Sequence, residues 1–370
     1  MHHAHAGLKT PEYYVPGLPA DYVAQRYGIP FADIAKLGSA ENPHGASSLA
    51  TEAVREHLNA LHLYPSWTAD PLREKIAETY GFDPSEVICG AGETEILSLI
   101  TRGFCPPGDK IQMPGPCFPI YHLFAEAEGR IPVLVHDATD RQSMALNVEA
   151  YIAAIEPETR IVYITNPHSP SGTWLDESEV RRIVEASAHA LVVLDEAYVH
   201  YSDTPGYIHL AAEYENLAVL RTFSKAFGLA GLRIGFGVAR RPIIDTLLAV
   251  KPTWNMGQLQ IVGGVAALDD DEHVERTIQT IVKNREYVQG RFQELDRFRM
   301  VGGSRSNFFL VELLDPDIDS TGVFLGLLER GVVVKDGSVS FRGLDDRFLR
   351  CDVNLQPHMD RLIDALADLS

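Results

Sequence analysis

Short apolar runs alternate with segments of helical spacing through the middle of the chain. The helical segments include residues 177–187, where Val180, Ile183 and Val184 recur at the spacing of one helix face. The runs that we predict to be strands are residues 110–113, 131–135, 161–165, 191–194, 217–221 and 232–238. Repeated strand–helix–strand order of this kind indicates an α/β fold with a mainly parallel central sheet.

The pattern changes on both sides of this region. Residues 1–45 are rich in Pro, Gly and Tyr and have little periodicity, which indicates an arm lying on something larger. After about Trp254, a long polar helix, two short strands and a closing helix are predicted at residues 271–297, 308–311, 332–334 and 359–369. A chain of 370 residues exceeds the usual size of one core. We therefore predict an N-terminal arm or small-domain segment (1–45), a large cofactor-binding domain (46–255) and a small α+β domain (256–370).

Composition and charge exclude several classes of partner. Apolar residues are 45% and charged residues 22% of the chain, as in soluble globular proteins, and the net charge is −19. That charge argues against binding to nucleic acid or to an anionic membrane surface, since both need basic patches. No apolar stretch is long enough to span a membrane, and residues 1–7 lack the apolar core of a secretory signal.

Histidine and cysteine positions give no strong sign of a metal site. His2, His3 and His5 could form one, but we favour a loose polar tail or a remnant of an added tag. The four cysteines show no C-x-x-C spacing and are Cys89, Cys105, Cys117 and Cys351. We therefore expect reduced thiols, no bound metal and a cytoplasmic protein.

Polar clusters follow three of the predicted strands. Asn166 follows the strand at 161–165, Asp195 follows the one at 191–194, and residues 222–225 follow the one at 217–221. In parallel α/β sheets the ligand lies beyond the carboxyl ends of the strands. We therefore expect these clusters to meet in one site.

The last of these clusters has the residue types that a phosphorylated aldehyde cofactor needs. The lysine amine of Lys225 can form an imine with an aldehyde, and Thr222, Ser224 and Arg233 can hold a phosphate. Glycines between them let the backbone approach a ligand closely. An ordinary surface lysine in a Gly-rich turn is the alternative, which we favour for a lone Ser-Lys pair but not for a string of this length.

This string, TFSKAFGLAGLRIG from Thr222 to Gly235, resembles the lysine motif of class I/II aminotransferases and is most similar to that of histidinol-phosphate aminotransferases. The resemblance extends in order over nearly the whole chain. It implies the aspartate aminotransferase-like fold (fold type I), pyridoxal 5'-phosphate (PLP) as cofactor, and Lys225 as the lysine that holds it.

Asp195-Glu-Ala-Tyr198 is similar to a second motif of the family. The resemblance implies that Asp195 pairs with the pyridine nitrogen and keeps it protonated, and that Tyr198 hydrogen-bonds the phenolic oxygen of the ring. The residues alone make a weaker argument: a carboxylate directly after an apolar strand needs a partner. A helix N-cap is the alternative role for Asp195.

Two further segments resemble cofactor-binding elements. Residues 90–95 (Gly90-Ala-Gly92-Glu93-Thr94-Glu95) resemble the family's Gly-rich turn before a helix, where the backbone N–H groups at Gly92, Glu93 and Thr94 would receive the phosphate. An ordinary turn between a strand and a helix would have the same sequence pattern. Phe118 stands where the family has an aromatic that stacks on the cofactor ring, and a core phenylalanine is an equal alternative.

The resemblance also implies substrate-binding residues and a shared dimer site. Tyr64 would reach the phosphate of the neighbouring subunit, and Tyr14 would cover the substrate from across the interface of a homodimer. The segment with Asn42 would line the carboxylate pocket, and Arg350 would clamp the α-carboxylate of an amino-acid substrate with two hydrogen bonds. A surface arginine is the alternative for Arg350.

Three departures from the family pattern concern the reaction and the substrate. Ser169, next to His168, stands where an asparagine normally donates to the phenolic oxygen. Lys335 replaces the arginine for a substrate phosphate, and Asp336 is expected to offset part of its charge. The residues after Arg350 are Cys-Asp-Val-Asn where the family has Ile-Thr-Val-Gly.

We predict a PLP-dependent aminotransferase that moves an amino group from an amino acid to a 2-oxo acid or related carbonyl, with Lys225 as general acid–base. The alternative is a PLP-dependent lyase, decarboxylase or cyclase that uses the same lysine. A PLP-binding regulatory module is a third class, and the absence of a basic helix argues against it.

Overall fold

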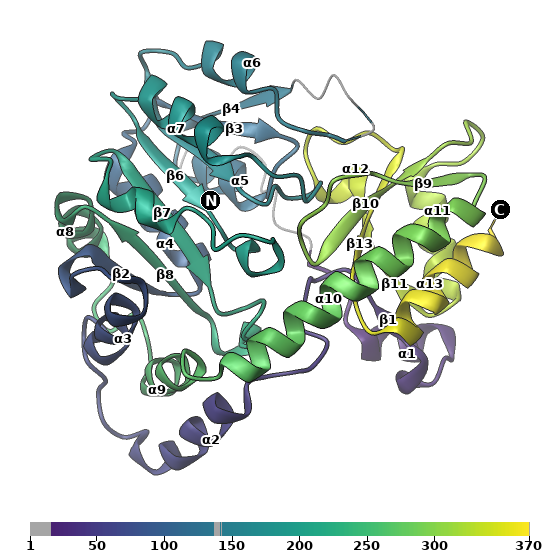
Figure 1. Cartoon of the computed structure of the whole chain (residues 1–370), viewed down its shortest axis with the longest axis horizontal. Helices are drawn as coiled ribbons and strands as arrows, with labels where there is room; N and C mark the ends of the chain where they lie inside the picture. The colour runs from purple at the N-terminus through teal and green to yellow at the C-terminus, as the bar shows by residue number, and fades with distance from the viewer. Residues whose placement is uncertain (1–15, 137–140, 142, 370) are drawn as a thin grey trace, which may run out of the picture.

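The structure is a computed structural model that describes residues 16–136, 141 and 143–369. Figure 1 shows a larger α/β region and a smaller C-terminal region, with the helix α10 (Asp271–Arg291) running from one toward the other. The predicted helix at 271–297 therefore ends earlier, and a short 3-10 turn at Phe292–Glu294 follows it.

The larger region is built on a seven-stranded sheet in the order β2-β8-β7-β6-β5-β3-β4. The strands in that order are Val87–Ala91, Ile234–Ala239, Leu217–Thr222, Leu191–Asp195, Thr159–Thr165, Lys110–Gly115 and Ile131–His136. β8 runs antiparallel to both of its neighbours, and the other neighbouring strands are parallel. The prediction of a mainly parallel sheet is confirmed, although the strand β2 was not predicted because its last residues were assigned to the Gly-rich turn.

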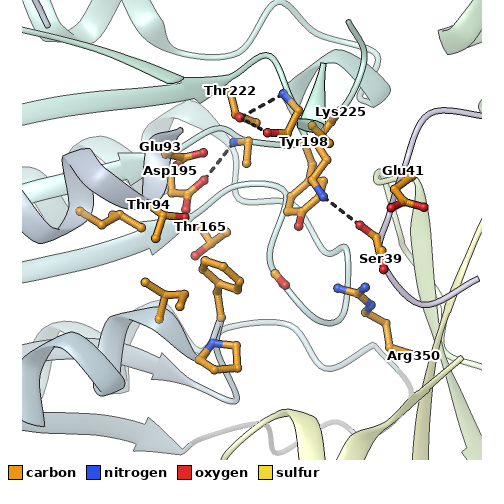
Figure 2. Close-up of a pocket in the computed structure, with 18 of the residues that line it drawn as sticks. Ser39, Glu41, Glu93, Thr94, Thr165, Asp195, Tyr198, Thr222, Lys225 and Arg350 are labelled. Carbon is orange, nitrogen blue, oxygen red and sulfur yellow. Dashed lines mark hydrogen bonds between the residues drawn. The ribbon is translucent and has the colours of Figure 1, made fainter. Parts of the chain in front are cut away.

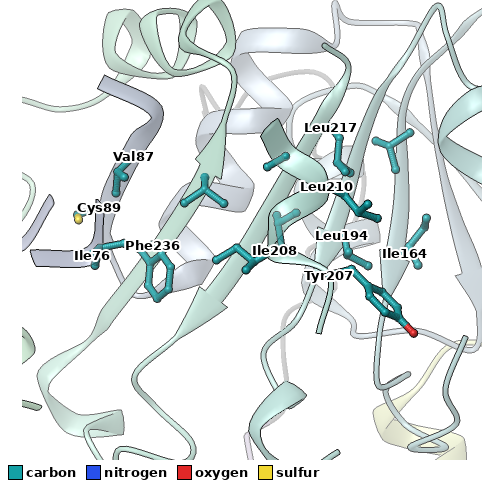
Figure 3. Packing of buried hydrophobic residues seen from close by; sticks show 14 of the residues in the cluster. Ile76, Val87, Cys89, Ile164, Leu194, Tyr207, Ile208, Leu210, Leu217 and Phe236 are labelled. Atoms are coloured by element: carbon teal, nitrogen blue, oxygen red, sulfur yellow. The ribbon is translucent and has the colours of Figure 1, made fainter. Parts of the chain in front are cut away.

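Helices cover both faces of this sheet because its central strands are apolar on both sides. On β6, Val192 and Leu194 join one buried cluster with the helices α3 (Asp70–Tyr80) and α7 (Glu177–Ala186). Leu191 and Val193 join a second cluster with α4 (Glu93–Phe104), α5 (Ile120–Ala127) and α8 (Arg241–Val250). Figure 3 shows part of the first cluster.

The smaller region has a four-stranded antiparallel sheet in the order β12-β13-β10-β9. These strands are Lys335–Asp336, Phe348–Asp352, Phe308–Leu313 and Phe298–Met300. The helices α11 (Ser320–Glu329) and α13 (Gln356–Ala367) pack on it. Arg350 of β13 stands opposite Lys335 of β12, which brings their side chains to one face.

The N-terminal segment joins this smaller region. Strand β1 (Ala35–Lys36) pairs in parallel with β11 (Val332–Val333). The helix α1 (Ala20–Tyr27) buries Val23 in a cluster with Leu328 and Val333.

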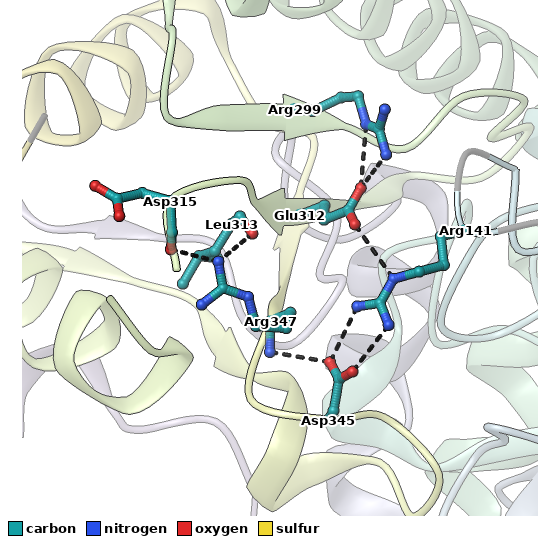
Figure 4. Close-up of polar contacts among 7 residues, drawn as sticks. All are labelled: Arg141, Arg299, Glu312, Leu313, Asp315, Asp345 and Arg347. Atoms are coloured by element: carbon teal, nitrogen blue, oxygen red, sulfur yellow. Dashed lines mark hydrogen bonds and ion pairs between the residues drawn. The ribbon is translucent and has the colours of Figure 1, made fainter. Parts of the chain in front are cut away.

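Ion pairs also connect the two regions (Figure 4). Arg141, which comes from the larger region, donates from Nη1 to Asp345 Oδ2 at 3.0 Å and from Nε to Glu312 Oε1 at 3.3 Å. Arg342 donates from Nη1 to Glu126 Oε1 at 2.6 Å. Within the chain that the structure describes, no helix is both long and apolar enough to cross a membrane, and no group of three His, Cys, Asp or Glu side chains could hold a metal ion.

Candidate active site

A cavity of about 400 Å³ lies between the two regions, at the carboxyl ends of the central parallel strands. Thr165, Asp195 and Thr222 are the last residues of β5, β6 and β7, and all three line it. It brings together most of the side chains singled out in the sequence, which are Glu93, Thr94, Phe118, Ser169, Asp195, Tyr198, Thr222, Ser224, Lys225, Arg233, Lys335 and Arg350. Figure 2 shows how several of them point into the same space.

Lys225 extends from the loop after β7 toward the N-terminal segment. Its Nζ donates to the backbone oxygen of Ser39 at 3.1 Å and lies 5.4 Å from the centre of the Tyr198 ring. Desolvation, followed by the positive charge of Arg350, lowers the pKa of Lys225 to about 8. A larger share of this amine is therefore neutral near physiological pH than for an exposed lysine.

A buried carboxyl pair lies deeper in the cavity. Asp195 Oδ1 accepts from the Ala197 N–H at 2.9 Å, and Oδ2 accepts from the hydroxyl of Tyr121. Burial raises the pKa of Asp195, and burial together with the charge of Asp195 raises the pKa of Glu93 well above its usual range. Two adjacent buried carboxylates do not both ionise readily, so Glu93 holds the proton and Asp195 is the anion.

A third part of the cavity suits a phosphate group. Thr222 Oγ1 lies 3.0 Å from Ser224 Oγ, and Arg233 Nη1 donates to Ser224 Oγ at 3.3 Å. The helix α4 begins here at Glu93. Gly92, which caps it, has φ +78°, and a Cβ at this position would collide with Arg233 Nη2. Two hydroxyls, a guanidinium and a helix N-terminus at one corner match a doubly charged oxyanion.

Arg350 and Lys335 form the wall of the cavity on the side of the smaller region. Arg350 Nη2 donates to the Gly38 backbone oxygen at 3.3 Å and to Asp352 Oδ1 at 3.2 Å. The Phe308 and Phe341 rings flank the guanidinium at 4.8 and 5.5 Å. Desolvation, with the nearby charge of Arg350, lowers the pKa of Lys335 to about 8.

The carboxylate that acts on Lys335 is not the expected one, Asp336. Asp336 caps the short helix α12 (Gly337–Ser340), and its two oxygens accept from the hydroxyls of Ser320 and Thr321 at 2.6 Å. The prediction that Asp336 offsets the charge of Lys335 is therefore wrong. The buried carboxylate that acts on Lys335 is Asp352.

The side chains of two residues near the cavity are occupied by contacts with other parts of the protein. Asn42 Nδ2 donates to the Ala226 backbone oxygen at 2.8 Å and to Thr277 Oγ1 at 3.1 Å, so this side chain fastens the Lys225 loop to α10. His168 lies 2.8 Å from Ser171 Oγ through Nδ1 and 2.9 Å from the Pro116 backbone oxygen through Nε2. Burial lowers the pKa of His168 to about 4, so this imidazole is neutral.

The two tyrosines expected at a subunit interface lie away from the cavity or outside the described residues. Tyr64 is 80% exposed and stacks on Trp254 with ring centres 4.5 Å apart. Tyr14, like His2, His3 and His5, lies outside the described residues.

Three polar atoms of the cavity wall have no hydrogen-bond partner among the residues that the structure describes. They are Glu93 Oε1, Ser169 Oγ and Arg350 Nε. Buried polar atoms are rarely left without a partner, so these atoms indicate a polar ligand. With the amine of Lys225 and the phosphate corner, the residues present fit PLP.

Sequence reasoning missed several residues of the site. Tyr121 belongs to the apolar face of α5, where a core aromatic is the ordinary expectation, and no local signal marks it as a partner of Asp195. Lining residues that it did not assign to the site include Ser39, Leu97, Thr165, Ser340 and Phe341. Two of these had a signal: Ser39 lies close to the segment 41–45 that resembles a substrate-pocket element, and Thr165 ends a predicted strand.

Comparisons with known proteins agree with this site. A family model described as aminotransferase class I and II matches residues 32–366. The chain is 33% identical over 362 residues to a histidinol-phosphate aminotransferase of Methanothermobacter thermautotrophicus, which covers 97% of this chain and 95% of that one. It is 36% identical over 366 residues to one of a Geobacillus species, with 96% and 95% covered.

Solved structures show the same fold. The crystal structure of a histidinol-phosphate aminotransferase from Sinorhizobium meliloti, in complex with PLP, superposes with a TM-score of 0.84 at 22% identity and covers 96% of each chain. An aminotransferase from Mycobacterium tuberculosis gives 0.87 at 19% identity, with 100% and 99% covered. The chain therefore belongs to the class I and II aminotransferases, enzymes of fold type I that depend on pyridoxal 5'-phosphate.

Proposed function

We propose that this aminotransferase moves an amino group between an α-amino acid and a 2-oxo acid, with the α-carboxylate of the substrate held by Arg350. The observation that carries this proposal is that Lys225 Nζ and the guanidinium of Arg350 line the same cavity. One supplies an amine of lowered pKa, and the other supplies a planar fork with a buried Nε that has no partner among the described residues. Transfer of an amino group from an α-amino acid needs an amine that can move a proton and a cation that holds the adjacent carboxylate.

Each part of PLP has residues that would hold it. When bound, PLP supplies an electron-accepting ring next to the amino carbon of the substrate. Asp195 would pair with the ring nitrogen, Tyr198 and Ser169 would face the ring oxygen, and Phe118 would cover the ring. The phosphate would be held by Gly92, Glu93 and Thr94 through the backbone and by the side chains of Thr222, Ser224 and Arg233.

Lys225 would move the proton. With a pKa near 8, its Nζ can accept a proton from the amino carbon of the substrate and return it to the cofactor side. The Ser39 backbone oxygen orients this amine, and Asn42 fixes the loop that carries it.

We also propose a homodimer with shared active sites in the cytoplasm. Large apolar side chains are exposed in the segment between α2 (Ser48–Glu56) and α3 and at Trp254, which stacks on Tyr64; they are Leu58, Leu61, Leu63, Tyr64, Trp67 and Trp254. An exposed apolar patch of this kind supports a subunit interface. Tyr64 within it, and Tyr14, would then complete the site of the partner. The four cysteines are buried free thiols, which supports a reducing compartment.

A panel of amino acids mixed with the purified holoenzyme tests the reaction. Transamination converts the cofactor to its pyridoxamine form and releases a 2-oxo acid, which absorbance and mass spectrometry detect. Ammonia, carbon dioxide or a cyclised product with an unchanged cofactor would favour the lyase, decarboxylase or cyclase instead. The family match does not favour that alternative.

A further inference from the structure

Asp352 lies directly behind Arg350 and outside the cavity. It ends strand β13 and is only 2% exposed. Its Oδ1 accepts from Arg350 Nη2 at 3.2 Å, and its Oδ2 accepts from the backbone N–H of Ala40. A buried carboxylate with these two partners fixes the position of both.

The contacts of Asp352 extend to the segment that faces Lys225. The Asp352 backbone N–H donates to the Leu37 oxygen at 2.9 Å, and Arg350 donates to the Gly38 oxygen. The next residue, Ser39, accepts from Lys225 Nζ. Asp352 therefore sets both the direction of Arg350 and the position of the chain opposite Lys225.

The charge of Asp352 also changes what the cavity wall attracts. Arg350 and Lys335 are two cations on adjacent strands, and Asp352 is the buried carboxylate in contact with one of them. Glu41, an acid that also lines the cavity on this side, is exposed and paired with Lys36 at 2.7 Å. The three side chains Arg350, Lys335 and Asp352 together carry one net positive charge, which matches one carboxylate.

Beside Arg350 stands Phe341, one of several apolar side chains in the lining of the cavity. The others include Leu97, Phe118 and Ile120. An apolar lining suits an uncharged substrate side chain. A second anionic group would lose its hydration there, and this wall has no second net positive charge to compensate for that loss.

We propose that Asp352 is a positioning residue that holds Arg350 and also determines specificity, so that the site takes substrates with one carboxylate and an uncharged side chain over substrates with a second anionic group. This inference rests on the proposed function of Arg350. It also accounts for a departure from the family pattern that the reaction itself leaves unexplained, the acid two residues after Arg350.

Two isosteric and unreactive ligands test the proposal. Glutarate has two carboxylates, and glutaramate has one carboxylate and one amide of the same shape. Calorimetric titration of the holoenzyme gives the ratio of their dissociation constants. We expect the wild type to prefer glutaramate, and Asp352→Asn and Asp352→Thr to shift the ratio toward glutarate by roughly five- to tenfold, as expected for one charge at this range in a partly screened site.

The control is Asp336→Asn. Asp336 is the neighbouring buried acid, and an amide there can keep its contacts because the hydroxyl of Thr321 can accept as well as donate. This variant should leave the ratio unchanged. Lys335→Gln removes a cation and keeps the Asp352 side chain. It should therefore shift the ratio of dissociation constants toward glutaramate, and this test remains even if neither Asp352 variant folds.

The results separate this inference from the proposed function. Equal weakening of both ligands, or an unchanged ratio in the folded Asp352 variants, overturns the claim about specificity, and so does an unchanged ratio in Lys335→Gln. Failure of the wild type to form any 2-oxo acid overturns the proposed reaction, while the binding ratio still tests Asp352.

Discussion

Single side chains carry the chemistry, and Lys225 is the one that reacts. The cavity holds two lysines of lowered pKa, Lys225 and Lys335, but only Lys225 lies at the end of a strand beside the phosphate corner. Borohydride reduction of the holoenzyme should therefore attach the cofactor to Lys225, which peptide mass spectrometry locates. A label on Lys335 would contradict the assignment. Lys225→Arg should abolish the label, since a guanidinium does not lose its proton at this pH.

Arg350 offers a second test at the scale of one residue. A planar fork grips a carboxylate with two hydrogen bonds, and a lysine cannot reproduce this geometry. Arg350→Lys should reduce kcat/KM for α-amino acids by about 1.5–3 kcal/mol of transition-state stabilisation. Cofactor affinity should be nearly unchanged. Arg299→Lys, at an ion pair with Glu312 outside the cavity, is the matched control. An unchanged kcat/KM in Arg350→Lys would place the carboxylate site elsewhere.

Sequence could predict the residues whose chemistry is local. Lys225 and its hydroxyl neighbours are contiguous, so their spacing alone indicates a site. Tyr121 and Asp352 could not be predicted in the same way. Tyr121 of α5 reaches Asp195 of β6 because both elements contribute to the same buried cluster, and Asp352 binds the Ala40 N–H across 312 residues of sequence. These partnerships depend on packing and strand register, which no local pattern encodes.

The ends of the strands are held by a buried ion pair next to the site. Arg221 of β7 donates from Nη2 to Glu196 Oε2 at 2.7 Å, and Glu196 directly follows Asp195, the last residue of β6. Both side chains are almost fully buried, so the loss of one partner leaves a buried charge uncompensated. We expect Glu196→Ala to lower the free energy of unfolding by about 3–5 kcal/mol, measured by urea denaturation followed by circular dichroism.

The matched double variant separates charge from packing. Glu196→Leu with Arg221→Met removes both charges and should recover most of the lost stability. A double variant as unstable as Glu196→Ala would show that the packing of these strand ends, and not the charge, is what matters.

At the scale of helices and strands, the sequence pattern predicted the apolar strands well and the very short strands poorly. The strands β3 to β7 were predicted within about two residues of their ends because each has a short core rich in apolar residues. Strand β2 was missed because Gly90 and Ala91 belong to the turn motif as well. The two-residue strands β1 and β12 are too short for any periodicity and exist only through their partners.

For the whole molecule, the apolar patch around Tyr64 predicts the oligomeric state. Leu61 is 62% exposed within this patch, so a buried charge there should oppose association. Leu61→Glu should lower the dimer fraction in light scattering. Leu325→Glu, at an equally apolar exposed site on α11, should leave the dimer intact. A wild type that is monomeric and active would contradict the shared site.

Tyr64→Phe tests the contribution of this residue to the partner site. The variant keeps the ring that stacks on Trp254 and loses only the hydroxyl. It should remain dimeric and retain the cofactor less tightly, by about 1.5–3 kcal/mol for one hydrogen bond to a charged group. Equilibrium dialysis of PLP measures this loss. Unchanged retention would show that the hydroxyl does not reach a phosphate.

The contact between Arg350 and Gly38 sets an order of events during synthesis. These residues are 312 positions apart, so the ribosome must release nearly the whole chain before the carboxylate clamp can form. The phosphate-binding side chains that one subunit supplies, by contrast, lie within the chain from Gly92 to Arg233. A nascent chain could therefore capture its cofactor before it is able to recognise a substrate.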